Sequence, residues 1–333
     1  MKLYFKTYLI YYPIFWIGYL FFEITNKTYW YPYVAFRRLF VLTKGKSNDF
    51  MNDHLKKNYP SYPIDSAKGV LGQLNKQQIE SIAQKISEDG YYIFDTKLSH
   101  EKILELTQFA QTTEAVLIPV AKDGTKRAVY NRDALLSPRY QFDESSVMKN
   151  PIIQELATDS TLFAIAQCYL GCKPIQDLTA MWWSTVFSKT ASSEAAQLYH
   201  FDMDRFKFIK FFFYLTDVDT YNGPHCYVRS SHKHMPNNLW KDGRILDEEI
   251  NESFSKEDIL EIKGPKGTII AVDTRGLHKG KVLEKGERLI LQFEFTNSLF
   301  GVQYEKIDVK SNVTADVKSF LSKYSYSFQR FNF

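Results

Sequence analysis

The feature that most constrains the fold is a change of hydrophobic pattern near residue 178. Before it, apolar residues recur at helical spacing over 75–89, 101–111 and 151–170, with a short strand predicted at 91–94. After it come short aromatic and β-branched runs at 181–187, 206–215, 268–272 and 288–296, separated by turn residues. Helices followed by a series of strands predict an α+β domain, in which helices flank an antiparallel sandwich or barrel.

The segment 75–89 gives the sharpest local prediction. Asn75 precedes the apolar pattern, and Gln78 lies three residues after Asn75, as in a capping box. Gly90 stands where a left-handed residue ends a helix. We therefore expect a helix that begins after Asn75 and stops at Gly90.

Composition excludes several classes of protein. Hydrophobic residues make up 44% and charged residues 24%, which is typical of a globular chain and not of a disordered or coiled-coil one. The net charge of +4, without a clustered basic patch, does not favour a nucleic-acid partner. An odd count of three cysteines suits a reducing compartment, so we expect a cytoplasmic protein.

Residues 1–42 form an aromatic-rich arm that contains sixteen aromatic residues. Its uncharged stretch from Thr7 to Phe22 includes Pro13 and Gly18, and is shorter than the roughly 20 residues of a spanning helix. Tyr and Trp favour the membrane interface, and Arg37 and Arg38 could contact anionic headgroups, which indicates a peripheral membrane anchor. An arm packed on the main domain or in an oligomer interface is an equal alternative.

The arm is followed by a polar segment, residues 43–68, in which Gly45, Pro60 and Pro63 indicate a linker. The main domain is then expected to occupy residues 69–333. Within it, the long charged loop at 121–143 is either a lid over a site or solvated surface.

The strand-rich half contains a set of residues suited to metal chemistry. In Y-H-F-D-M-D, His200 and Asp202 are two apart, so on a strand both side chains would project from one face. His278 follows in D-T-R-G-L-H, and Arg288 lies ten residues further on. Two histidines and one carboxylate form the facial set of non-haem iron oxygenases. An arginine fork is a suitable anchor for the distal carboxylate of a dicarboxylate co-substrate.

From about Leu74 to Leu299 the chain resembles the phytanoyl-CoA dioxygenase family of Fe(II)- and 2-oxoglutarate-dependent oxygenases. The matching segments include H-F-D, Y-L-T-D-V-D-T-Y-N-G-P, R-S-S-H-K, G-T-I-I-A-V-D-T-R-G-L-H-K-G and E-R-L-I-L-Q-F. The resemblance implies a double-stranded β-helix, or jelly roll, with flanking helices. It also implies that His200, Asp202 and His278 bind iron, that Arg288 binds 2-oxoglutarate, and that O2 is the second co-substrate. The sequence departs from the family at Arg229 and Ser230, where Pro-Gly is usual.

Further site residues are predicted near this set. Thr185 and Trp183 are candidates to line the pocket, Thr185 on the cofactor side, while Asp204, Arg205 and Arg275 are candidates for substrate contact. His225, His232 and His234 also cluster, and we assign them loop or supporting roles. By the resemblance, the retained Asp202 favours hydroxylation over halogenation.

The sequence is consistent with three functions. The first is a dioxygenase that hydroxylates an unactivated C–H bond of a small or amphiphilic, lipid-like substrate at a membrane surface. The second is a soluble hydroxylase of an amino acid or secondary metabolite, with the arm packed on the barrel. The third is a non-catalytic jelly-roll binding module.

Overall fold

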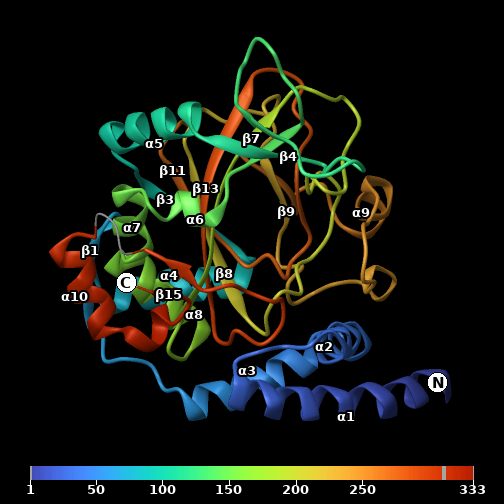
Figure 1. The fold of residues 1–333 in the computed structure, drawn as a ribbon. Helices are drawn as coiled ribbons and strands as arrows, with labels where there is room; N and C mark the ends of the chain where they lie inside the picture. The colour runs from blue at the N-terminus through green and yellow to red at the C-terminus, as the bar shows by residue number, and fades with distance from the viewer. Residues whose placement is uncertain (1, 310–312, 333) are drawn as a thin grey trace.

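Two β-sheets face each other, with helices on the outside of the larger sheet and at one end (Figure 1). The computed structural model describes residues 2–309 and 313–332. Its helices are α1 Lys2–Thr25, α2 Trp30–Thr43, α3 Lys46–Asn58, α4 Lys76–Asp89, α5 His100–Thr112, α6 Glu144–Val147, α7 Pro151–Ala157, α8 Ser160–Leu170, α9 Asp247–Ser253 and α10 Ala315–Lys323. Its strands are β1 Ser66–Gly69, β2 Gly72–Asn75, β3 Tyr91–Lys97, β4 Glu114–Ile118, β5 Arg127–Val129, β6 Arg139–Gln141, β7 Ile175–Thr185, β8 Phe208–Tyr214, β9 His225–Val228, β10 Ile259–Ile262, β11 Thr268–Val272, β12 His278–Gly280, β13 Glu287–Thr296, β14 Ile307–Asp308 and β15 Phe331–Asn332.

The larger sheet has the strand order β3-β11-β8-β13-β7-β6-β4-β5, and the smaller one has the order β10-β9-β12. All neighbouring strands in both sheets are antiparallel. This confirms the predicted α+β class and the double-stranded β-helix. A hydrophobic cluster fills the space between the sheets, with Trp182, Tyr214, Tyr227, Ile270 and Ile290 among its members.

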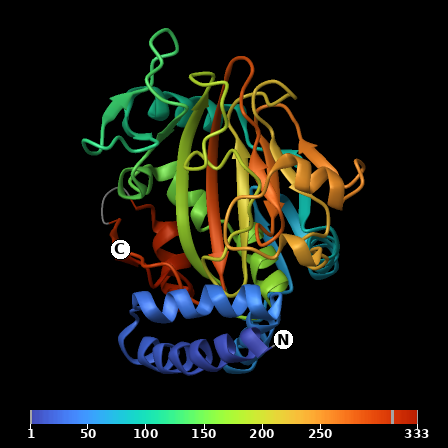
Figure 2. The same cartoon turned by 90° about the vertical axis from the view of Figure 1, so that its right-hand side faces the viewer.

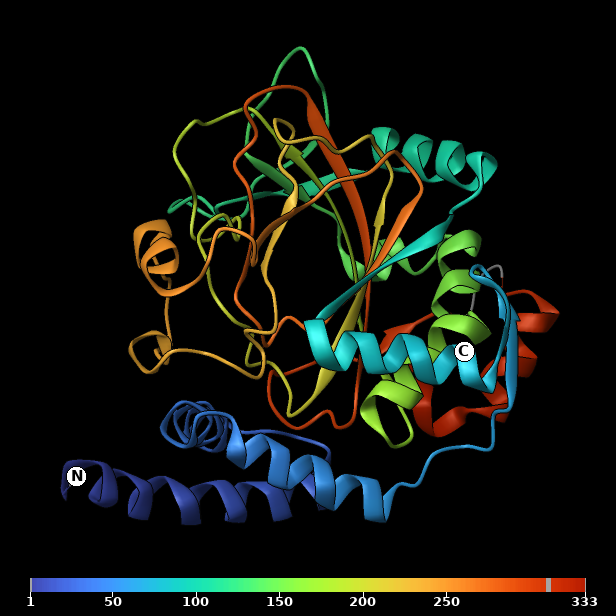
Figure 3. The ribbon, with the colours of Figure 1, turned by 180° about the vertical axis from the view of Figure 1, so that it is seen from behind.

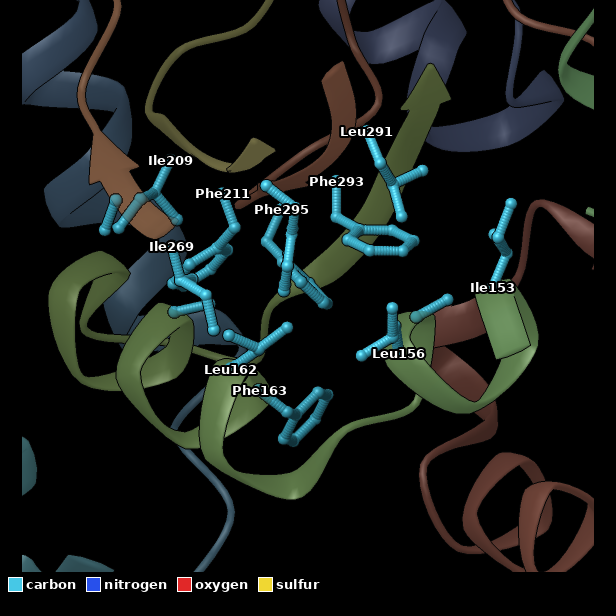
Figure 4. Packing of buried hydrophobic residues seen from close by; sticks show 14 of the residues in the cluster. Ile153, Leu156, Leu162, Phe163, Ile209, Phe211, Ile269, Leu291, Phe293 and Phe295 are labelled. Carbon is cyan, nitrogen blue, oxygen red and sulfur yellow. The ribbon is translucent and has the colours of Figure 1, made fainter. Parts of the chain in front are cut away.

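The main core lies on the other face of the larger sheet. Phe211 of β8 and Phe293 of β13 pack there with Leu162 and Phe163 of α8, as Figure 4 shows. Helices α4, α5 and α10 complete this layer, which Figure 3 shows from behind. Because one face of the sheet is covered by helices and the other faces the smaller sheet, its central strands are buried on both sides.

Most elements of the main domain match the predicted segments. Helix α4 has the capping box between Asn75 and Gln78, and Gly90 ends it with a φ of 87°. The predicted helix at 151–170 is wrong in one respect, because it is two helices. Asp159 accepts hydrogen bonds from the backbone of Thr161 and Leu162 and so caps a new helix, α8.

The arm forms a layer of helices across one end of the barrel (Figure 2). Pro13 lies inside α1, and Gly18 allows a close approach to α2, since a Cβ there would lie 2.2 Å from the Pro32 ring. The predicted linker at 43–68 is wrong for half of its length, because α3 occupies Lys46–Asn58 and buries Met51 and Leu55 against α1 and α2. Much of the polar composition that indicated a linker belongs to the exposed residues of this helix, such as Asp53 and Lys57.

The inner side of the arm packs on the segment that follows His200. The Phe206 ring contacts Phe15, Tyr19 and Phe36 from the arm. The Phe40 ring lies 5.8 Å from the Phe201 ring. From the next helix, α3, the side-chain amide of Asn48 donates to the carbonyl oxygens of Arg205 and Phe206, at 3.4 and 3.0 Å. The arm is therefore part of the folded body.

Candidate active site

Two histidines from distant parts of the chain face each other across an antiparallel β-bridge. The His200 N–H donates to the His278 carbonyl at 3.0 Å, and the His278 N–H donates to the His200 carbonyl at 2.9 Å. Reciprocal bonding of this kind fixes the two backbones about 5.5 Å apart at Cα. The ring centroids consequently lie 4.3 Å apart.

Asp202 completes the group. His200 Nε2 lies 3.6 Å from Asp202 Oδ1, and His278 Nε2 lies 3.6 Å from Asp202 Oδ2. One ligand atom from each of the three residues lies within 4.8 Å of the others. The predicted set is thus brought together, although the H-x-D segment is a bridge followed by a loop and not the strand we expected.

The hydrogen bonds of the two imidazoles leave their Nε2 atoms free for a metal. His200 Nδ1 lies 2.8 Å from the Leu198 carbonyl oxygen, and His278 Nδ1 lies 2.9 Å from that of Gly276. A ring whose Nδ1–H donates to a carbonyl presents an Nε2 lone pair. Burial, together with the neighbouring His278, lowers the pKa of His200 to about 3, and burial also lowers the pKa of His278. Both rings are therefore neutral, as metal ligands must be.

A buried lysine holds the carboxylate. Lys210 Nζ of β8 donates to Asp202 Oδ2 at 2.7 Å and lies 3.4 Å from Glu294 Oε2. Burial by itself would raise the pKa of Asp202, but the charge of Lys210 and the two histidines bring it well below its ordinary value. The carboxylate is thus ionised, with one oxygen engaged by Lys210 and the other directed to His200.

These residues line a cavity of about 530 Å³ between the sheets, and Arg288 of β13 lies in its wall. Arg288 Nη2 donates to Ser184 Oγ at 3.2 Å. Its Nε and Nη1 are buried, and within the described part of the chain they have no hydrogen-bond partner. A buried guanidinium with two unused donors is suited to an anionic ligand. Two neutral imidazoles and one carboxylate are a donor set that fits iron, with three sides of the metal left open.

The family model for phytanoyl-CoA dioxygenase (PhyH) matches residues 86–282, more than half of the chain. The chain belongs to the phytanoyl-CoA dioxygenase family. It is accordingly an enzyme, an Fe(II)- and 2-oxoglutarate-dependent dioxygenase that uses O2. No curated protein matches this dioxygenase in sequence.

The chain is also similar to solved structures. The crystal structure of EctD from S. alaskensis with bound Fe has a TM-score of 0.51 and 16% identity to the dioxygenase, covering 74% of this chain and 92% of that chain. The non-heme alpha ketoglutarate dependent epimerase SnoN from nogalamycin biosynthesis has a TM-score of 0.49 and 15% identity, covering 67% of this chain and 84% of that chain. The likeness to EctD supports the double-stranded β-helix.

Two predicted pocket residues of β7 point away from the cavity of the dioxygenase. Trp183 lies in the main core, donates its indole N–H to the Ala110 carbonyl at 3.1 Å, and stacks on Tyr130. Thr185 donates to the Ser137 carbonyl at 2.7 Å. Because side chains alternate along a strand, Trp182 and Ser184 take the inward positions, beside Arg288. The predicted pocket residues Trp183 and Thr185 are therefore each wrong by one position along β7.

The three predicted substrate contacts also lie elsewhere. Arg205 forms a buried ion pair with Asp177, at 2.6 and 3.0 Å, beside a second cavity that Asp204 also lines. Arg275 pairs with Asp273. Both arginines are neutralised within the fold, so they do not supply substrate contacts in the metal cavity.

Three cavity residues were missed or given another role. Arg139, which was placed in the 121–143 loop, lies on β6 and lines the cavity, as Lys210 does from β8. His225, assigned a supporting role, lines it from β9, with its ring 5.5 Å from that of His278. His232 is held in the loop after β9, with Nε2 3.0 Å from the Ser87 carbonyl oxygen.

Proposed function

We propose that this dioxygenase hydroxylates an unactivated C–H bond of a small or amphiphilic substrate, with His200, Asp202 and His278 as the iron ligands. The convergence of these three side chains within 4.8 Å, in one cavity with the unpaired Arg288, carries the proposal. The iron–2-oxoglutarate pair, when bound, supplies the activation of O2 for oxygen transfer to carbon. The presence of a carboxylate ligand at Asp202 favours transfer of a hydroxyl group.

The surrounding residues each have a physical task in this proposal. The Leu198 and Gly276 carbonyls fix the imidazole tautomers, and Lys210 orients the Asp202 carboxylate. Arg288 binds the distal carboxylate of 2-oxoglutarate through its free donors, while Ser184 sets the plane of the guanidinium. Phe212 and Trp182 line the same cavity and exclude water from it.

Anaerobic titration with Fe(II) and 2-oxoglutarate tests the site. Wild type should develop the visible charge-transfer band of the chelate, His200→Ala should lose it, and Arg288→Gln should need about 10- to 100-fold more 2-oxoglutarate, as for loss of a charge-assisted bond. The exposed His234→Ala and Arg229→Gln are matched controls that should keep the wild-type curve. If His200→Ala retained the band, the ligand assignment would be wrong.

We also propose that the arm, residues 1–42, rests on a membrane surface while the dioxygenase domain, residues 69–333, faces the cytoplasm. The segment Tyr8–Thr25 is long and apolar enough to cross a membrane by length and composition, and only 22% of it is buried. Its inner side, however, packs on the barrel through Phe15, Tyr19 and Phe22. An orientation in the membrane plane keeps this packing and still covers the exposed aliphatic side, with Trp30 and Tyr31 at the interface.

Flotation with phosphatidylcholine and phosphatidylserine vesicles tests the arm. Wild type should float with the vesicles, and the triple variant Ile17→Ser, Leu20→Ser and Ile24→Ser should stay in the soluble fraction. Leu104→Ser on α5, which removes an equally exposed leucine, is the control and should float. If wild type did not float, the second function, a soluble hydroxylase with a packed arm, would be favoured. The non-catalytic module is set aside, because the family is one of dioxygenases.

A further inference from the structure

Arg139 and Arg288 lie in one row across three strands of the larger sheet. Arg139 of β6 is the register partner of Ser184 of β7, and Ser184 is in turn the partner of Arg288 of β13. Residues directly opposite each other across antiparallel strands project from the same face. With strands about 4.8 Å apart, the two arginine backbones lie about 10 Å apart. Both side chains line the same cavity.

Neither guanidinium of this row is neutralised within the fold. Among residues 2–309 and 313–332, no ion pair is formed by either of them; Arg139 donates to Gln141 and lies 4.3 Å from the centre of the Trp182 ring. By contrast, Arg205, Arg275 and Arg330 are paired with Asp177, Asp273 and Glu144. Burial lowers the pKa of Arg139 to about 9, and the nearby Arg288 contributes to this shift. A buried positive charge without a counter-ion, beside a second one, is costly in free energy.

The acidic groups that reach the cavity are already engaged. Asp202 is bound by Lys210, while Asp143 pairs with Arg127 and Glu144 with Arg330. The positive charges of Arg139 and Arg288 therefore have to be balanced by an anionic ligand. His225 adds one more buried donor or acceptor, because its Nε2 has no partner in the described part of the chain.

We propose that Arg139 binds an oxyanion of the substrate, so that this dioxygenase acts on molecules that carry a carboxylate or a phosphate. The inference rests on the proposed function, which assigns the distal carboxylate of 2-oxoglutarate to Arg288. Arg139 is then left with an unmatched charge. Its guanidinium lies over Trp182, and its Nε and Nη2 donate to Gln141. The Nη1 side of the planar fork is left to donate to an oxyanion, which both carboxylates and phosphates supply.

The test compares three probes that carry the same eight-carbon alkyl chain and differ in the head group alone: nonanoate, octyl phosphate and octanol. Each is titrated by calorimetry into the full-length protein loaded with Fe(II) and 2-oxoglutarate under anaerobic conditions. We expect at least one anionic probe to bind wild type about tenfold or more tightly than octanol, as for a charge-assisted bond. The stronger of the two anions identifies the oxyanion.

Variants then assign the preference to Arg139. Arg139→Gln should bind all three probes alike, while Arg139→Lys, which keeps the charge but not the fork, should retain part of the preference. The Kd of 2-oxoglutarate should stay within about twofold of wild type in Arg139→Gln, and Arg229→Gln should match wild type throughout. Far-ultraviolet circular dichroism checks that each variant is folded.

Three results would overturn the proposal. The first is that octanol binds wild type as tightly as the stronger of the two anions does. The second is that neither anion binds. The third is a loss of 2-oxoglutarate affinity in Arg139→Gln as large as in Arg288→Gln, which would assign Arg139 to the co-substrate. Failure of the proposed function is separate, because wild type would then lack the Fe(II)–2-oxoglutarate band. In that case the probes are titrated into the unloaded protein, where comparison of Arg139→Gln with Arg288→Gln shows which arginine carries the anion preference.

Discussion

The two sides of α1 have similar hydrophobicity but different surroundings. The inner side carries Phe15, Tyr19 and Phe22, which are buried against Phe206 and Phe300. The outer side carries Ile17, Leu20 and Ile24, and Ile24 is 82% exposed. On the inner side, aromatic rings meet those of the barrel edge to face, while the aliphatic side chains of the outer side are left uncovered. The mean hydropathy of a helix therefore does not reveal which of its sides contacts the protein.

The largest effect should come from removing the centre of the inner contact. Phe36 of α2 is 1% exposed and meets Phe206 and Phe300. Phe36→Ala should lower the free energy of unfolding by about 3–5 kcal/mol, because it deletes a buried ring and leaves a cavity. Urea unfolding measures the loss. A change below about 1 kcal/mol would mean that the arm is not part of the core.

A smaller effect is expected where α3, the helix after the arm, holds the backbone that follows Asp202. Asn48→Ala removes the two bonds to the carbonyls of Arg205 and Phe206 and leaves those oxygens buried. The expected loss of stability is about 1–2 kcal/mol, accompanied by a higher Kd for Fe(II), since the ligand segment is less well held. Asn58→Ala, at the exposed end of the same helix, is the control. Equal results for the two variants would contradict a role for Asn48.

The smallest effect should come from the outer side. Ile24→Ser should change the free energy of unfolding by no more than about 0.5 kcal/mol, as is usual for an exposed position. Thermal unfolding in the absence of lipid measures it. A loss above about 1 kcal/mol would show that the outer side of α1 is covered in solution, and the comparison between the two sides would no longer hold.

The sequence predicted helices and strands well where neighbouring residues determine them. The capping residues of α4 and the strand at Thr268–Val272 occur as expected. The capping residue Asp159 also indicates the division between α7 and α8, but the apolar pattern continues across it and predicted a single helix. Likewise, α3 was missed because most of its residues are polar and only a few apolar ones, such as Met51 and Leu55, are buried.

The candidate site was predictable only in part, for a physical reason. His200, Asp202 and His278 belong to a recognisable motif, but the inward face of β7 could not be read from its sequence. That strand is buried on both sides, so it lacks the polar and apolar alternation that would separate Trp182 from Trp183. Arg139 and Lys210 reach the cavity from other strands, and only the folded sheet shows that both line it.

The bridge between His200 and His278 links metal uptake to the completion of folding. Its two hydrogen bonds join segments that lie far apart in the chain, so the loop between them must close before the proposed ligands can meet. Only the finished barrel then binds the metal, and each tenfold excess of free iron over the Kd adds about 1.4 kcal/mol to the stability of that state. With the proposed ligands, chains in which this bridge is open would be found in the iron-free fraction.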